Sequence, residues 1–366
     1  KSTNDKNKIS KKFNFFEIKN FLNNYFKRFY SQFSKKKKIC LLMSGGFDST
    51  LITHYWKKYF KTDMNVYTIY FENGQTKDTA LSKLISKKSN INQTLVIFSK
   101  KNLISLLNKV YKKYDYPIAT VSQLAFIDLY DHINIKYDTI ITGYGGDYLF
   151  GGSYNSFLYN LSDLRKKSTK EFNLELNYWI KNHSTNLFPK NKKIFEKFEK
   201  KFCKKKQGVI NDVFREEVNF KRLFNKKINI KNYKCNIESE KKYLETYTKW
   251  AYKFESVSPV ADTELLLDFH TDFKTISPFL SKELQNLSLN TPSNLKIKKG
   301  VNRIFIRKLL KNTIYKKIIN EKDKFGFNCP LDKWIQEDKE IFNYIKKKLF
   351  KEKSICMKIY GKNFLE

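Results

Sequence analysis

The sequence predicts an α/β protein with a doubly wound parallel sheet and a helical C-terminal region. Short apolar runs alternate with longer segments of helical periodicity, and two of these runs end directly in clusters of glycine. Strands that alternate with helices form parallel sheets that are covered on both faces. The chain has 366 residues, of which 41% are hydrophobic, and is long enough to bury such a core. Ligands of these sheets bind beyond the carboxyl ends of the strands, so we expect the site at the glycine clusters.

The first half of the chain supplies the alternating elements. Apolar residues recur at a spacing typical of one helix face between Phe13 and Phe33, which predicts an amphipathic helix. Apolar runs predict buried strands at residues 39–43, 66–71, 95–98 and 139–142. Helices are expected at residues 49–60, 77–88, 101–114 and 121–133.

We expect five segments along the chain. Changes in composition and pattern place their boundaries: a basic tail at 1–12, an α/β core at 13–154, a Lys-rich helical insert at 155–245, a helical C-terminal part at 246–350 and a basic tail at 351–366. Four prolines punctuate the helical C-terminal part.

The net charge of +36, from 72 basic and 36 acidic residues, suggests a polyanionic partner. Only six of the 72 basic residues are arginine, however. Arginine is preferred for bidentate contacts to phosphates and bases. We therefore interpret the excess lysine as a solvated surface and do not expect a nucleic-acid partner.

Other compositional features exclude further classes of protein. The five cysteines are scattered without a Cys-x-x-Cys pair, and the four histidines lie far apart. This pattern argues against a disulfide scaffold, a zinc ribbon and a His-rich metal centre. No apolar run approaches the roughly 18 residues of a membrane span, and the N-terminal residues lack the apolar stretch of a secretory signal. We expect a soluble, cytoplasmic protein without a membrane partner.

The strongest functional signal is the turn Ser44-Gly-Gly-Phe-Asp-Ser-Thr50, directly after the first buried strand. Glycines let the main chain turn so tightly that successive N–H groups point inward, and the positive end of the next helix faces the same point. The turn therefore predicts a cradle for an anion. The hydroxyl groups of Ser44, Ser49 and Thr50 are additional donors, and the Asp48 carboxylate is suited to Mg²⁺. The Gly-Lys-Ser/Thr of a Walker A loop does not follow at the required spacing.

This turn resembles the SGGxDS hallmark of the ATP pyrophosphatase (PP-loop) superfamily. The resemblance implies a sheet of the PP-loop type that binds ATP and Mg²⁺. It also implies that the loop holds the pyrophosphate of ATP while the substrate attacks the α-phosphorus. The residues that we expect at the nucleotide come from both glycine clusters: Ser44, Gly45, Gly46, Asp48, Ser49, Thr50, Gly143, Gly145 and Gly146.

Four further segments narrow the resemblance to the synthase domain of asparagine synthetases. They are similar to the family patterns DEPxAD, SGEGxDExFGGY, EARVPFLD and KxGFxxPxxxW, and they lie at residues 115–120, 140–152, 255–262 and 324–334. Their order along the chain is that of the family, and the resemblance covers roughly residues 13–340.

Two differences from that family concern the amine that forms the new bond: where it comes from and how it loses its proton. Asparagine synthetases begin with a glutaminase domain, and we expect this chain to act without one. The amine is then free, part of the substrate, or delivered by another chain. Tyr144 stands where asparagine synthetases carry glutamate, and in this the chain resembles β-lactam and carbapenam synthetases. That resemblance implies that Tyr144 works with Glu255 to remove a proton from the attacking amine.

The reaction also needs positive charge beside the phosphates, because negative charge builds on their oxygen atoms. The resemblance implies Asp48 and Asp147 as ligands of Mg²⁺ and Lys324 as a cation. Arg303 and Arg307, spaced i, i+4 on an expected helix, are placed to reach phosphate or to pair with an acidic residue. The sequence leaves both interpretations open.

We therefore expect an AMP-forming carbon–nitrogen ligase that adenylates a small-molecule carboxylate, releases pyrophosphate and lets an amine attack, as in β-lactam synthetase-like ring closure. One alternative is ammonia-dependent amidation of a carboxylate, fed by a separate glutaminase. Another is tRNA modification by a PP-loop enzyme, which would use the charge of +36 directly. A noncatalytic ATP-binding partner is a third.

Overall fold

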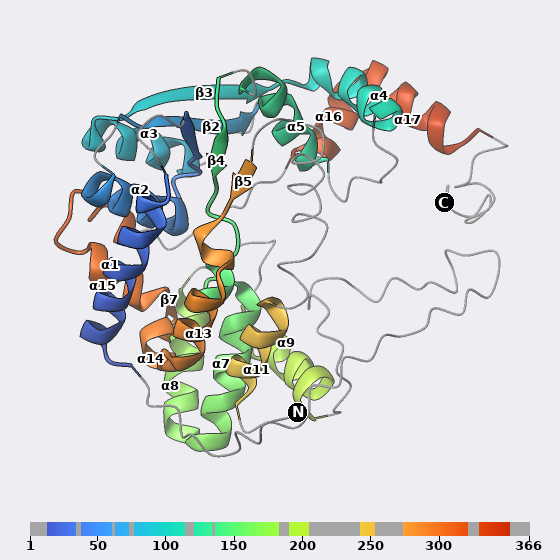
Figure 1. The fold of residues 1–366 in the computed structure, drawn as a ribbon. Helices are drawn as coiled ribbons and strands as arrows, with labels where there is room; N and C mark the ends of the chain where they lie inside the picture. The colour runs from blue at the N-terminus through green and yellow to red at the C-terminus, as the bar shows by residue number, and fades with distance from the viewer. Residues whose placement is uncertain are drawn as a thin grey trace, which may run out of the picture.

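The computed structural model describes residues 13–33, 38–60, 63–72, 77–113, 121–133, 136–182, 190–204, 242–252, 274–320 and 329–351. Their centre is a five-stranded parallel sheet with the order β3-β2-β1-β4-β5 (Figure 1). The strands are β1 (Ile39–Leu42), β2 (Asn65–Phe71), β3 (Asn92–Phe98), β4 (Thr139–Ile141) and β5 (Lys274–Ile276). The chain runs outward from β1 to β3 and then returns to place β4 on the other side of β1. The doubly wound sheet predicted from the sequence is confirmed.

Helices cover both faces of this sheet because its central strands are buried on both sides. In β1, Leu41 packs in one core cluster and Cys40 in the other, and Ile141 and Ile140 of β4 divide in the same way. The first face is covered mainly by α1 (Phe15–Ser31), α2 (Phe47–Tyr59) and α3 (Lys77–Ser89). The second face is covered by α4 (Leu103–Lys113), which follows the short η1 (Lys100–Asn102), and by α5 (Ser122–Ile133), α16 (Leu331–Glu337) and α17 (Lys339–Leu349).

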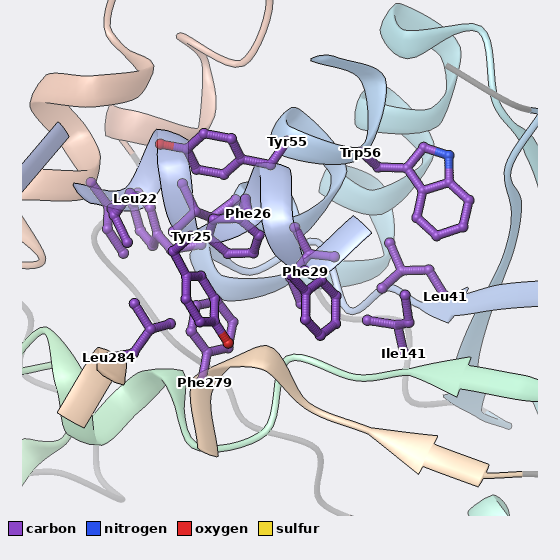
Figure 2. Packing of buried hydrophobic residues seen from close by; sticks show 14 of the residues in the cluster. Leu22, Tyr25, Phe26, Phe29, Leu41, Tyr55, Trp56, Ile141, Phe279 and Leu284 are labelled. Carbon is purple, nitrogen blue, oxygen red and sulfur yellow. The ribbon is translucent and has the colours of Figure 1, made fainter. Parts of the chain in front are cut away.

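Helix α1 fixes the position of α2, the helix that follows the first glycine cluster. Asn14 and Glu17 form a capping box that starts α1. Its buried stripe comprises Ile18, Leu22, Tyr25, Phe26, Phe29 and Tyr30. The ring of Phe26 stacks on Tyr55 of α2 with centroids 4.3 Å apart (Figure 2). Stacked aromatic pairs of this kind add to the free energy gained by burying their surface.

Most predicted elements differ from the observed ones by only a few residues. Strand β3 begins at Asn92, whereas its apolar run predicted a start at residue 95. The reason is that β3 is an edge strand, so the polar residues 92–94 pair with β2 while they remain partly exposed. Helix α2 begins at Phe47, two residues before the predicted start at residue 49, which places Asp48 in its first turn.

A second group of helices packs beside the sheet in the lower half of Figure 1. Its members are α7 (Tyr154–Lys167), α8 (Thr169–Lys181), α9 (Lys192–Phe198), the π-helical η2 (Glu199–Lys204) and α11 (Tyr243–Trp250). Their buried side chains, among them Trp179, Phe195 and Tyr247, form a cluster of their own. The described part of residues 155–245 is therefore largely helical.

The described C-terminal region is largely helical and also contributes three short strands, for which no run of apolar residues was evident. Strand β5 extends the parallel sheet, and β6 (Ile297–Lys298) pairs antiparallel with β7 (Val301–Asn302). These strands have two or three residues each, too few to show a periodic apolar pattern. The remaining elements are α6 (Gly146–Leu149), η4 (Pro278–Leu280), α13 (Lys282–Asn290), α14 (Ser293–Lys296), α15 (Ile304–Leu310) and η5 (Ile318–Asn320). Across the described ranges, no helix has both the length and the apolar character needed to traverse a bilayer.

Candidate functional site

The two glycine clusters singled out in the sequence lie next to each other. Strand β1 leads into residues 44–50 and β4 leads into residues 143–152, and the two strands pair directly, with Leu41 opposite Ile141. The strand order reverses between β1 and β4. In open parallel sheets, the crevice beyond the carboxyl ends at such a point is where ligands bind.

The first cluster turns the chain from β1 into α2. Gly45 has a φ of +83°, a left-handed conformation that residues with side chains rarely adopt. Gly46 is the N-cap of α2, and no side chain in the described part of the chain caps this helix. The N–H groups of a first helical turn have no partner within the helix, and the positive end of the helix dipole lies there. The turn therefore has the properties of an anion site.

Hydroxyl groups stabilise this turn from within. Thr50 Oγ1 and Ser49 Oγ donate to the carbonyl oxygen of Gly46 at 2.7 and 3.2 Å. Ser44 Oγ accepts a hydrogen bond from the Gly46 N–H at 3.2 Å. Ser49 and Thr50 are buried and Ser44 is exposed. Ser49 and Thr50 thus shape the loop, and Ser44 is the most accessible of the three predicted hydroxyl donors.

Asp48 lies against the second glycine cluster. A Cβ atom built on Gly146 would lie 2.5 Å from Asp48 Cγ, and one built on Gly143 would lie 3.2 Å from the main-chain nitrogen of Ser49. The approach at Gly146 leaves no room for a side chain. The fold thus brings together the residues of two clusters that lie about a hundred positions apart in the sequence.

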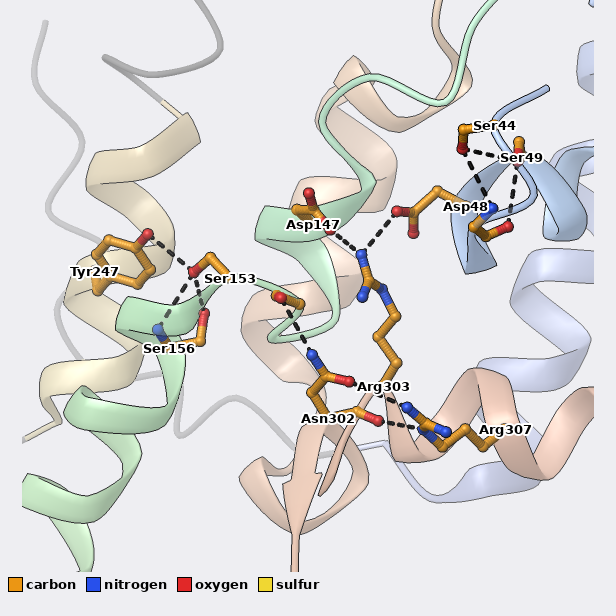
Figure 3. Close-up of polar contacts among 12 residues, drawn as sticks. Ser44, Asp48, Ser49, Asp147, Ser153, Ser156, Tyr247, Asn302, Arg303 and Arg307 are labelled. Atoms are coloured by element: carbon orange, nitrogen blue, oxygen red, sulfur yellow. Dashed lines mark hydrogen bonds and ion pairs between the residues drawn. The ribbon is translucent and has the colours of Figure 1, made fainter. Parts of the chain in front are cut away.

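A guanidinium group joins the carboxylates of Asp48 and Asp147 (Figure 3). Arg303 Nη2 donates to Asp48 Oδ2 at 2.9 Å and also to Asp147 Oδ1. The side chains of Arg303, Asp48 and Asp147 are 4%, 13% and 29% exposed. Such shielding from water makes these ion pairs stronger than pairs on a surface. Of the two interpretations left open for Arg303, pairing with acidic residues is confirmed.

Arg303 is held in place by its surroundings. It is the N-cap of α15 and has φ and ψ of 52° and 35°, a left-handed conformation that costs on the order of 1–3 kcal/mol for a residue other than glycine. The guanidinium carbon atoms of Arg303 and Arg307 lie 5.6 and 4.4 Å from the ring centroid of Phe47. Arg307 Nε donates to the Asn302 carbonyl at 2.7 Å, and Asn302 Nδ2 donates to the Gly152 carbonyl at 3.1 Å. The start of α15 is thereby attached to both glycine clusters.

The two aspartates offer the kind of oxygen ligand that a magnesium ion takes at a nucleotide site. Carboxylate oxygen is a ligand that Mg²⁺ prefers, and at nucleotide sites one or two carboxylates commonly suffice, since phosphate oxygens and water complete the coordination. Asp48 Oδ1 is buried and has no hydrogen-bond partner within the described ranges. No group of three or more His, Cys, Asp or Glu side chains suited to a metal occurs among the described residues.

Tyr144 lies beside the end of β5. Ser277 Oγ donates to the main-chain oxygen of Tyr144 at 2.6 Å. A Cβ atom on the neighbouring Gly145 would lie 2.9 Å from Leu280 Cδ2. The segment that follows β5 therefore packs against the second glycine cluster. The other predicted catalytic residues, Glu255 and Lys324, lie outside the described residues, as does the segment 115–120.

Ser277 and Leu280 were not among the residues predicted for the site. A signal was present, because residues 277–280 read Ser-Pro-Phe-Leu and so carry the Pro-Phe-Leu of the EARVPFLD pattern. Residues 258–261, in the segment that supplied Glu255, read Ser-Pro-Val-Ala. The assignment of Glu255 stays a prediction.

Burial shifts the pKa of two side chains, His54 on α2 and Cys329 just before α16. Burial, together with the nearby positive charges of Lys58 and Lys19, lowers the pKa of His54 on α2 to about 4. The His54 ring packs against Tyr55 and Tyr315. Burial raises the pKa of the Cys329 thiol to about 12. Since the thiolate is the reactive form, Cys329 is not suited to act as a nucleophile near neutral pH.

A curated relative is "Asparagine synthetase [glutamine-hydrolyzing] 1" of Bacillus subtilis (strain 168), which is 22% identical over 315 residues. The alignment covers 81% of this chain and 47% of the relative, so the chain spans about half the length of that protein.

Solved structures with a similar arrangement include the NH3-dependent NAD synthetase from Campylobacter jejuni subsp. jejuni NCTC 11168. It is 14% identical, with a TM-score of 0.29 and coverage of 38% of this chain and 62% of the other. The U34-tRNA thiolase NcsA from Methanococcus maripaludis is 13% identical, with a TM-score of 0.30 and coverage of 82% and 78%.

The pattern of the Asparagine synthase family matches residues 30–360, which is most of the chain. The match includes both glycine clusters, the three bridged residues Asp48, Asp147 and Arg303, and the segment after β5. The chain therefore belongs to the Asparagine synthase family.

Proposed function

We propose that this protein is an ATP-dependent, AMP-forming ligase that adenylates a small carboxylate, releases pyrophosphate and joins the acyl group to an amine. The observation that carries the proposal is the convergence of the first turn of α2 with residues 143–152 at the point where the strand order reverses. Membership of the Asparagine synthase family and the likeness to an asparagine synthetase support this class of reaction.

The turn at residues 44–50 is the proposed site for the pyrophosphate part of ATP. The uncapped start of α2 offers main-chain N–H groups, and Ser44 offers an accessible hydroxyl. Asp48 and Asp147 would hold Mg²⁺, which supplies positive charge for the phosphate oxygens. Lys324 would add a second cation, so that the negative charge of departing pyrophosphate is stabilised.

The first chemical step is the attack of a substrate carboxylate oxygen on the α-phosphorus of ATP. The bond between the α-phosphorus and the bridging oxygen breaks, pyrophosphate leaves, and an acyl-adenylate forms. In the second step the amine attacks the acyl carbon and AMP leaves. The amine must lose a proton as it attacks. Tyr144 would accept this proton and pass it to Glu255, since a phenol acts as a relay only where a carboxylate can receive its proton.

Tyr144 favours an amine that already belongs to the substrate or to a second small molecule, as in β-lactam synthetase-like cyclisation. The second candidate is ammonia-dependent amidation. It is favoured by the likeness to a glutamine-hydrolysing asparagine synthetase, of which this chain spans about half. The two reactions share the adenylation step and differ in the nucleophile.

ATP–pyrophosphate exchange in the presence of a panel of small carboxylic acids tests the proposal. At least one acid should support exchange with AMP as the product, and Lys324→Ala should abolish that exchange. Lys311→Ala, at an exposed lysine of the same region, is the matched control and should retain it. Release of orthophosphate instead of pyrophosphate would contradict the proposal. Turnover that depends on tRNA would support the alternative of tRNA modification.

A further inference from the structure

We propose that Arg303 is a positioning residue that acts as the resident counter-cation of Asp48 and Asp147, and that Mg²⁺ competes with its guanidinium for these carboxylates. The inference rests on the proposed role of the two aspartates as metal ligands. It adds that loading of the metal requires Arg303 to leave the position seen here.

The hydrogen bonds of Arg303 occupy one carboxylate oxygen of each aspartate. Arg303 Nη2 bonds to Asp48 Oδ2 and to Asp147 Oδ1, so one nitrogen takes an oxygen from each carboxylate. In Figure 3 this nitrogen lies directly between the two side chains. The other oxygen of Asp48 is buried against Gly146, where a Cβ atom would lie 2.6 Å from it. Because Oδ1 of Asp48 is shielded in this way, a metal held by Asp48 competes with the guanidinium for Oδ2.

The charges of Asp48, Asp147 and Arg303 also affect metal binding. Two carboxylates that are brought together in a shielded site repel each other unless a cation lies between them. Arg303 is itself only 3% exposed, so its charge is not satisfied by water. The pairing holds the two loops together without a metal, and the same pairing must weaken the affinity of the site for a metal.

In this position, not every hydrogen-bond donor of the Arg303 guanidinium group has an acceptor. Arg303 Nε is buried and has no hydrogen-bond partner among the residues that the structure describes. The main chain at Arg303 is in the left-handed region, which is uncommon for a residue with a side chain. An arginine that served only to brace the fold would more commonly have its donors satisfied and its main chain relaxed.

The proposal is tested by measuring Mn²⁺ binding to the nucleotide-free protein by electron paramagnetic resonance. Arg303→Met should bind Mn²⁺ at least about tenfold more tightly than the wild type, a difference of about 1.4 kcal/mol. Its melting temperature should fall in metal-free buffer and recover when Mn²⁺ is added. Arg307→Met is the matched control, because Arg307 packs on the same Phe47 ring and donates to the main chain of Asn302 and Ile319. It should lose stability without a gain in Mn²⁺ affinity.

A purely structural role predicts another result. Arg303→Met would then lose stability and bind Mn²⁺ no more tightly than the wild type, which would overturn the proposal. The double variant Arg303→Met/Asp147→Asn should lose the gain in affinity, because the gain requires both carboxylates. Should Arg303→Met not fold, Arg303→Lys serves instead, since it keeps the charge but not the reach of the guanidinium. It should bind Mn²⁺ more tightly than the wild type, and equal or weaker binding would overturn the proposal.

These results are separable from the proposed function. Unchanged Mn²⁺ affinity in Arg303→Met, together with normal pyrophosphate exchange in the wild type, would refute the competition and leave the ligase activity intact. Tighter Mn²⁺ binding, together with exchange supported by no acid, would refute the ligase activity and leave the competition intact.

Discussion

Gly146 and Asp48 approach each other so closely that a single methyl group on the glycine would lie 2.5 Å from the aspartate carboxyl carbon. This contact joins the start of α6 to the first turn of α2 and so fixes the separation of the two loops. The aspartate cannot easily move away, because Arg303, which also pairs with Asp147, holds its carboxylate through Oδ2.

We therefore predict that Gly146→Ala lowers the free energy of unfolding by about 1–3 kcal/mol, as is usual for overpacking, and abolishes pyrophosphate exchange. Gly143→Ala is the graded comparison, because its Cβ atom would lie 3.2 Å from the nearest atom, and it should have a smaller effect on both. Denaturant unfolding and exchange assays measure the two quantities. Equal stability of Gly146→Ala and the wild type would show that the loops are not in this contact in solution.

Asp48→Asn should lower the rate of pyrophosphate exchange by about a thousandfold or more, which corresponds to roughly 4 kcal/mol of transition-state stabilisation. The physical reason is the loss of one negative ligand for Mg²⁺ beside the phosphates. The change also removes one of the two ion pairs of Arg303, so some loss of stability is expected.

The control for this change is Asp131→Asn, which breaks the partly exposed pair of Asp131 with Lys109 on the second face of the sheet. Exposed pairs contribute about 0–1 kcal/mol, so this variant should retain both stability and exchange. Exchange that survives in Asp48→Asn would rule out Asp48 as a metal ligand.

Tyr144→Phe should retain pyrophosphate exchange and lose formation of the amide. Exchange reports only adenylation, whereas the phenol is proposed to act in the later attack by the amine. The fold should tolerate the change, because phenylalanine keeps the aromatic ring and the hydrogen bond from Ser277 goes to the main-chain oxygen of residue 144. The measurement is the ratio of exchange rate to amide product in the variant and the wild type. A parallel fall of both would exclude the proposed role of the hydroxyl.

His54 should make stability depend on pH below neutrality. Burial lowers its pKa from 6.5 to about 4, so the unfolded chain takes up a proton at a higher pH than the folded chain does. The part of the free energy of unfolding that depends on His54 is therefore fully present above pH 6.5 and is lost progressively as the pH falls toward 4. Each unit of pKa difference is worth about 1.4 kcal/mol, so the loss from this group reaches up to about 3 kcal/mol.

The measurement is the free energy of unfolding at several values of pH for the wild type and for His54→Gln. The variant should show a shallower loss of stability between pH 6.5 and 4, because glutamine does not titrate. Identical pH profiles would mean that His54 is not buried as the structure places it.

The local pattern of the sequence was sufficient for the sheet and for the first loop. Four strands and the helices between them follow from runs of apolar residues, because strands buried on both faces leave a continuous apolar signal. The turn at residues 44–50 was recognisable because its tight geometry restricts which residues fit, as the φ of +83° at Gly45 shows. Strand β5 left no such signal, since a three-residue edge strand is held by main-chain hydrogen bonds more than by its side chains.

Tertiary structure alone decided which of these residues meet. From its sequence context, Arg303 was equally suited to be a phosphate ligand or a partner of an acidic residue, because a guanidinium suits both. The choice depends on where the start of α15 lies relative to α2 and α6. These helices are more than 150 positions away from α15 in the sequence, so only the tertiary fold sets their distance from it. The same holds for Ser277 beside Tyr144. Residue type limits the chemistry that each side chain can perform, but only the packing of distant segments sets the distances at which charges act.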